Sequence, residues 1–142
     1  MIYCTASDLE DYVLAQYLAK VEELNPGSVA RHIGRVSAEI DEALLVGGYT
    51  VPEENNSALL TRICAVMSAW RSIGEITSLM DTEASSANEW LPLQRLNTRS
   101  ENQLDKIRDG KLNPVPENTT EDCGIEVSAP PAIFSREKWE KF

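Results

Sequence analysis

Few residues in the sequence could do chemistry, and the first to weigh is His32, the single histidine. Catalysis of the Ser-His-Asp or Cys-His kind would have to run through it, but no nucleophile elbow and no orienting acid stands nearby at a diagnostic spacing. Glu39 and Asp41 point in different directions from one predicted helix, which is poor geometry for a shared metal or an acid-base pair. We therefore expect no catalytic residue and no enzyme activity, and we place these side chains on a solvated or interface surface.

The cysteines and glycines also lack the pattern of a known site. Cys4, Cys64 and Cys123 are odd in number, widely separated and without CxxC spacing, so they indicate neither a disulfide framework nor a zinc site. Gly47 and Gly48 follow a predicted helix rather than a strand and belong to no phosphate-binding motif. The sequence thus predicts no metal and no cofactor, and a reducing cytoplasm is the expected compartment.

Charge and composition narrow the class of protein. The chain of 142 residues carries 13 Lys and Arg against 23 Asp and Glu, a formal net charge of −10. Such an excess repels phosphate backbones, so the bulk surface is not expected to bind nucleic acid. With 42% hydrophobic residues the chain should fold as one domain. We expect no secretion signal and no membrane partner, because no run approaches the roughly 20 apolar residues of a membrane span.

Hydrophobic residues repeat at helical spacing in four segments, which must position any functional surface. The third segment is apolar over more than half its circumference, which predicts a central helix buried between its neighbours. The fold class expected is therefore all-α, a small four-helix domain over residues 1–112. The predicted helices cover residues 7–24, 28–46, 57–79 and 92–109, with a polar loop over 81–88.

Local signals mark where these helices begin and end. Ser7 and Glu10 have the spacing of a capping box, which opens the first helix. Gly47 and Gly48 end the second helix, and Gly110 is placed as the C′ glycine of the fourth. Each of these residues is thus assigned a structural role rather than a chemical one.

Residues 113–142 differ from the rest and are predicted to form an extended C-terminal arm. Four of the seven prolines and three of the nine aromatic residues fall here, and the hydrophobic residues follow no period. Such a segment cannot build a core of its own, so a binding arm is expected. Phe134, Trp139 and Phe142, with Arg136 among them, are the candidate anchors for a partner surface.

Charge divides along the chain. Residues 1–60 carry 3 bases and 10 acids, whereas residues 61–112 carry 7 of each. The bases of the second segment are expected to pair with the acidic first half of the same or a neighbouring subunit. Contacts of that kind between copies are heterologous and close into a ring where the rotation permits.

Several motifs resemble the Mu-like prophage head-tail connector family. Residues 37–44 read SAEIDEAL and residues 48–52 read GYTVP, similar to the family pattern AxxEIDxxL followed by RYxLP. The start MIYCTASDL over residues 1–9 is similar to the family's Y-x-T-x-x-D-L. The helix LLTRICAVMSAWR over 59–71 and the end QLDKIRDGKL over 103–112 follow in the family's order. The resemblance covers about residues 1–112.

The resemblance implies an all-helical adaptor that forms a ring beneath the portal of a tailed-phage capsid, in the virion neck. Expected partners are other copies of the chain, the portal protein and the next neck or tail protein, while DNA only passes through the channel. Glu39, Asp41 and Tyr49 lie in the matching motif, and we hypothesise that they contribute to an interface together with the arm residues. Acidic residues would suit a channel lining, because DNA would slide past them.

Two other classes stay open. The chain could be a cytoplasmic acidic binding protein that inhibits a host nucleic-acid-handling factor by presenting a DNA-like array of charge. It could also be a small hydrolase that uses His32 or a cluster of carboxylates, although no substrate can be proposed. A connector should form rings on the portal, whereas an inhibitor should be a monomer or dimer that binds a host protein.

Overall fold

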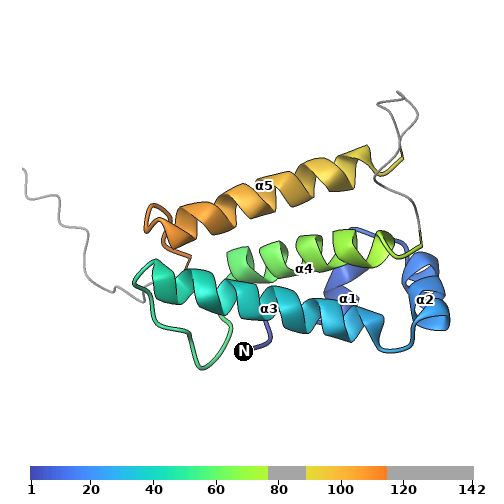
Figure 1. Cartoon of the computed structure of the whole chain (residues 1–142), viewed down its shortest axis with the longest axis horizontal. Coiled ribbons are helices and arrows are strands. Elements are labelled where there is room, and N and C mark those ends of the chain that lie inside the picture. Colours follow the sequence, from blue (N-terminus) through green and yellow to red (C-terminus); the bar gives the residue numbers. More distant parts are fainter. Residues whose placement is uncertain (77–88, 115–142) are drawn as a thin grey trace, which may run out of the picture.

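The computed structural model describes residues 1–76 and 89–114, and this part of the chain is helical, without strands (Figure 1). The prediction of an all-α fold is confirmed. Three long helices lie side by side, and two short ones cover one end. In chain order these are α1 (Ala6–Leu9), α2 (Ala15–Leu24), α3 (Ser28–Val46), α4 (Ala58–Ile73) and α5 (Leu91–Arg108).

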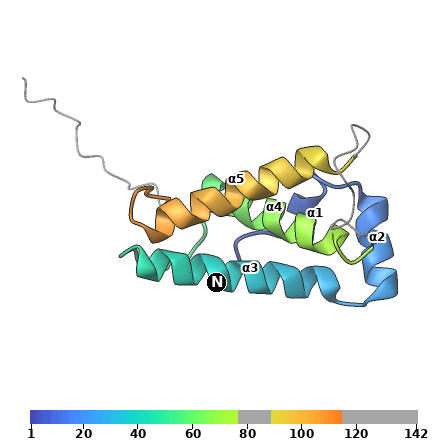
Figure 2. The ribbon, with the colours of Figure 1, turned by 45° about the horizontal axis from the view of Figure 1, so that its top comes forward.

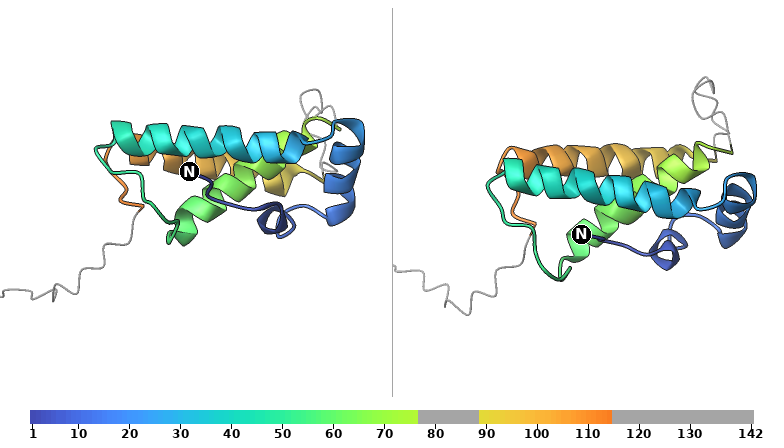
Figure 3. Two further views of the ribbon diagram at one scale, coloured as in Figure 1. Left: turned by 90° about the horizontal axis from the view of Figure 1, so that it is seen from below. Right: turned by 60° about the horizontal axis from the view of Figure 1, so that its bottom comes forward.

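Helix α4 is the central element, as its sequence predicted. It packs against α3, α5, α1 and α2, and Figure 2 shows it between α3 and α5. Every residue from Ile63 to Ala69 is buried. A helix that is apolar almost all round must be covered on all sides, which explains why the other elements surround it. Figure 3 shows that α4 crosses α3 obliquely, so that its first turns reach the α1 side of the molecule.

The first predicted helix, over 7–24, is wrong as a single element, because the chain turns between Leu9 and Ala15. The Val13 amide donates to the Leu9 carbonyl, and Leu14 then adopts an extended ψ of 139°. This turn lets Leu9 and Val13 enter the core while α2 runs in a different direction. A single helix over residues 7–24 would place Leu14 and Leu24 on its apolar face, but they are 62% and 65% exposed.

The capping box expected at Ser7 lies two residues earlier. The Thr5 backbone amide and hydroxyl both donate to the Asp8 carboxylate, at 2.6 and 2.9 Å. Thr5-x-x-Asp8 and Ser7-x-x-Glu10 have the same spacing, so the local pattern suits either start. Burial of Leu9 decides between them, because it sets where the single turn of α1 meets the core.

The ends of α3 and α5 are confirmed. Gly47 and Gly48 follow α3, and Gly48 has a φ of +84°. A side chain at Gly47 would place its Cβ 2.1 Å from the Ile107 carbonyl oxygen, so glycine lets α3 and α5 approach closely. Gly110 follows α5 with a φ of +69°, as predicted for a C′ residue.

Helix α4 ends earlier than the predicted residue 79. Gly74 caps it, and the Gly74 amide donates to the Trp70 carbonyl. The predicted loop over 81–88 lies outside the described residues, as does the arm from residue 115 on. Pro114 lies against the start of α4, since the hydroxyl of Ser57, the N-cap residue of α4, donates to the Pro114 carbonyl at 2.5 Å.

A pair of neighbouring leucines in α3 tests the core. Leu44 is fully buried, whereas Leu45 is 63% exposed. We expect Leu44→Ala to lower the free energy of unfolding by about 2–5 kcal/mol, because it leaves a cavity, and the same change at Leu45 to cost about 0.5 kcal/mol or less. Urea unfolding followed by circular dichroism measures both. Equal losses would contradict the placement of α3.

Candidate interaction surface

An N-terminal segment, residues 1–5, crosses between α3 and α4 and is hydrogen-bonded to α3 and to the loop before α4, with the candidate Asp41 among its partners. The Tyr3 amide donates to the Ser37 hydroxyl at 3.3 Å, and the Asn55 side chain donates to the Tyr3 carbonyl at 2.7 Å. The Tyr3 hydroxyl donates to Asp41 at 2.5 Å. Burial, and next the hydrogen bond with Asp41, raise the pKa of Tyr3, so this phenol stays protonated.

Asp41 therefore has an internal role. Besides Tyr3, it accepts a hydrogen bond from the Met1 amino group at 2.8 Å. Glu39 is engaged as well, because both its oxygens bond the Arg71 guanidinium of α4, at 2.7 and 2.8 Å. This bidentate pair raises the pKa of Arg71 and ties α3 to α4. That Glu39 and Asp41 contribute to an interface stays a prediction. A partner could contact only those parts of the two bonded carboxylates that remain exposed.

Tyr49, the third candidate from the same motif, lies at the end of α3. Its amide donates to the Leu44 carbonyl at 2.9 Å, and its hydroxyl donates to the Gly110 carbonyl at 3.4 Å. The half-buried ring thus joins the exits of α3 and α5. Its contribution to an interface also stays a prediction.

His32 belongs to a small polar cluster rather than to a triad. Its Nε2 lies 2.7 Å from the Glu75 carboxylate, which also accepts a hydrogen bond from the Ser28 hydroxyl at 2.6 Å. The bond from Ser28, followed by that from His32, lowers the pKa of Glu75. The cluster joins the start of α3 to the turn after α4, and its Ser28 hydroxyl is bonded to the Glu75 carboxylate rather than to the imidazole.

Four of the ten acids in residues 1–60 thus hold the subunit together. Asp8 caps α1, Glu39 and Asp41 form the bonds above, and Glu22 accepts from the Gly27 and Val29 amides at 2.7 and 2.9 Å. The backbone bonds, from Gly27 first, lower the pKa of Glu22. The other six are exposed and in no ion pair within residues 1–76 and 89–114: Glu10, Asp11, Glu23, Glu42, Glu53 and Glu54.

The bases of the second half divide in the same way. Arg71 pairs with Glu39, Arg108 with Asp105 at 3.0 Å, and Lys111 with Asp109 at 3.0 Å. Arg62 donates to Gln103 at 3.0 Å. The expectation of pairing within one subunit is confirmed for Arg71.

Three bases of α5 form what we call the basic row: Arg95, Arg99 and Lys106. All three are exposed, and none takes part in an ion pair within the part of the chain that the structure describes. They stand two positions after Leu93, Asn97 and Leu104 of the buried seam, about 200° around the helix. The row therefore faces away from the core. Its helical spacing was present in the sequence but was not separated there from the other bases.

The remaining candidates lie elsewhere. Phe134, Arg136, Trp139 and Phe142 are outside the described residues. Among the residues described, no group of three or more His, Cys, Asp or Glu side chains is arranged to hold a metal ion. Over the same residues, no helix combines the length and the apolar character that crossing a membrane requires.

Fold and surface together define a small all-helical protein with a dense core, internally bonded acids and a row of bases that faces outward. The chain matches the family model described as Bacteriophage Mu, Gp36, over residues 3–125, and it belongs to this family. It is therefore a phage-associated protein of the Mu-like kind. No curated protein and no solved structure matches it.

The polar cluster at Glu75 predicts a pH dependence of stability. Because the folded-state pKa of Glu75 lies below its unfolded value, its contribution is complete above the unfolded pKa and is lost as the pH falls through the folded one. Glu75→Gln should therefore cost about 1 kcal/mol near pH 7 and less at an acidic pH below the unfolded pKa of Glu75. Urea unfolding at both pH values measures the difference.

Glu42→Gln is the matched control, since Glu42 is exposed on α3 and in no ion pair among the described residues. It should change stability little at either pH. A loss at Glu75 that is equal at the two pH values would show that the charge of this carboxylate is not what stabilises the cluster.

Proposed function

We propose that this chain is a structural, non-catalytic subunit of the virion neck, a head-tail connector or adaptor. In this role it forms a homo-oligomeric ring beneath the portal, assembled in the host cytoplasm. The ring extends the DNA channel and presents a surface to the next neck or tail protein. Membership of a phage family supports the proposal, as do the motifs shared with head-tail connectors.

The observation that carries the proposal is the separation of unpaired charge on the subunit. The basic row lies on the outer face of α5, while Glu53 and Glu54 lie in the loop between α3 and α4. In Figure 1, α5 runs along one edge of the molecule and this loop lies at the other. Complementary charges on different surfaces suit a head-to-tail contact between copies, which closes into a ring where the rotation permits.

The strength expected of such a contact is modest for each pair. Exposed ion pairs contribute about 0.2–1 kcal/mol each and weaken with salt. A row of three bases against two acids therefore guides the register of neighbouring subunits, and portal contacts must supply much of the remaining free energy. This fits a protein that assembles on a template rather than by itself.

The same arrangement suits the passage of DNA. A net charge of −10 disfavours binding to phosphates. Bases covered by the next subunit are also withdrawn from the channel. DNA then meets a surface that does not hold it, so it can move through the ring.

The arm completes the proposal. Phe134, Trp139 and Phe142, with Arg136 among them, are proposed to contact the portal or an adjacent subunit. Aromatic side chains bury a large area with few rotatable bonds, which is why they are enriched at the centres of interfaces.

Charge reversal at Arg99 tests the contact between subunits. We expect Arg99→Glu to reduce the fraction of portals that carry a ring by about tenfold, because it places an acid opposite Glu53 and Glu54. Arg35→Glu on α3 changes the net charge equally at another exposed position and should leave assembly near the wild-type level. Electron microscopy of necks formed with the portal protein counts the rings.

A compensating change sharpens this test. The double variant Arg99→Glu with Glu54→Arg should recover ring formation, while Glu54→Arg alone should not exceed the wild type. If neither Arg99→Glu nor the double variant changes ring formation, the proposed charge contact between subunits is wrong. If the chain never joins the portal and instead binds a host protein as a monomer or dimer, it acts as the acidic inhibitor and the connector proposal is wrong.

Truncation tests the arm. A chain ending at Pro114 keeps the hydrogen bond between the Ser57 hydroxyl and the Pro114 carbonyl, so the helical domain should fold as before. We expect it to retain its circular dichroism spectrum and to lose stable attachment to the portal in sedimentation. Attachment at the wild-type level would show that the arm is not the anchor.

A further inference from the structure

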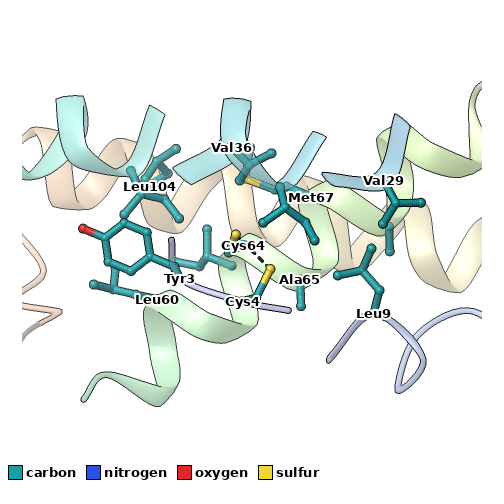
Figure 4. Close-up of a cluster of buried hydrophobic side chains, with 14 of the residues drawn as sticks. Tyr3, Cys4, Leu9, Val29, Val36, Leu60, Cys64, Ala65, Met67 and Leu104 are labelled. Carbon is teal, nitrogen blue, oxygen red and sulfur yellow. Dashed lines mark hydrogen bonds between the residues drawn. The ribbon is translucent and has the colours of Figure 1, made fainter. Parts of the chain in front are cut away.

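Two cysteines that lie 60 residues apart in the sequence meet in the core. The Sγ atoms of Cys4, in the N-terminal segment, and Cys64, in α4, are 3.0 Å apart (Figure 4). Cys4 is 4% exposed and Cys64 is fully buried. A disulfide joins sulfur atoms at about 2.05 Å, so the two side chains need to approach by only about 1 Å.

Neighbouring contacts on both sides hold this pair together. The Tyr3 amide is bonded to Ser37 of α3, and the Tyr3 carbonyl is bonded to Asn55 of the loop before α4. Beyond Cys4, Thr5 is bonded to Asp8. The main chain is therefore fixed directly before and after Cys4, which places its sulfur against α4.

We propose that Cys4 and Cys64 are a redox-sensitive pair, which forms an intramolecular disulfide when the folded chain meets an oxidant of the small-molecule disulfide class, such as oxidised glutathione. The bond would tie the N-terminal segment to the central helix. It would be absent in a reducing cytoplasm and would form after the protein leaves it. The proposal holds whether or not the chain forms a ring.

The reaction proceeds by two exchanges. When the N-terminal segment opens locally, the Cys4 thiol loses its proton to water, and its sulfur attacks oxidised glutathione. The glutathione S–S bond breaks and one glutathione thiolate leaves. The segment then closes, and the Cys64 thiolate attacks the Cys4 sulfur, which releases the second glutathione. The two cysteines lose two electrons and two protons, and one glutathione disulfide becomes two glutathione thiols.

The surroundings assign these roles. Cys4 lies in a segment without a helix of its own, so it reaches solvent at a smaller cost than Cys64, which lies inside α4. The hydrogen bond from the Cys4 thiol, and next that from the Ser37 hydroxyl, lower the pKa of Cys64 to about 7. The hydrogen bond with Cys64, and next burial, raise the pKa of Cys4. Once Cys4 carries glutathione it no longer donates to Cys64, but the Ser37 hydroxyl remains within 3.5 Å of the Cys64 sulfur. Because thiolates are the attacking species, this remaining donor suits Cys64 to the second step.

The test uses the full chain with Cys123→Ser, which removes the only other thiol. The folded protein is incubated with oxidised glutathione, quenched with acid, denatured and alkylated. Intact mass is expected to show the loss of two hydrogens, no alkylation and no glutathione adduct. The melting temperature should rise by roughly 10 °C, because the bond closes a long loop in the unfolded chain. Reduction with dithiothreitol should reverse both changes.

Cys64→Ser in the same background is the matched control. Its remaining Cys4 should hold glutathione as a stable mixed disulfide, since no second thiol can release it. In the chain with all three cysteines, the bond should join the tryptic peptide that ends at Lys20 to the one that spans 63–71. Persistent glutathione adducts on the two-cysteine protein, or two free thiols after prolonged oxidation, would overturn the proposal.

Discussion

The burial of α4 is the constraint on which the rest of the structure depends. A helix with apolar side chains around most of its circumference is stable in water only when other elements cover all its sides. Helices α3 and α5 cover it along its length, and α1, α2 and the N-terminal segment cover the remainder. The turn between α1 and α2, the close approach at Gly47 and the meeting of Cys4 with Cys64 all follow from enclosing this one helix.

Enclosing α4 also determines which charges are available to partners. Each carboxylate near the core needs a donor, because an unpaired charge that loses water is costly. Tyr3 donates a hydrogen bond to Asp41, and Arg71 donates to Glu39. Glu22 accepts hydrogen bonds from backbone amides at the start of the next helix. The acidic residues that produce the net charge therefore fall into two groups. One holds the subunit together, and the other, with the basic row, faces outward.

Sequence periodicity predicted most of the fold and less of the surface. The spans of α3 and α5 agree with the prediction because their apolar residues keep one helical face over four turns or more. Residues 7–24 also keep that spacing, yet a direction change was needed to bring Leu9 and Val13 into the core. Among the bases, local spacing indicated helices but not partners. Whether Arg71 or Arg99 finds a carboxylate depends on which helix lies opposite, and that is a long-range property.

By itself the sequence determined an acidic all-helical chain and the central position of α4. It also determined the glycines that end α3 and α5, and a likeness to one phage family. These follow from composition and from interactions within a few residues. Only the tertiary structure decided that Glu39 and Asp41 are bonded internally, that three bases of α5 face outward, and that Cys4 meets Cys64. Such contacts join residues 30 or more positions apart, and their geometry exists only once the helices have packed around α4.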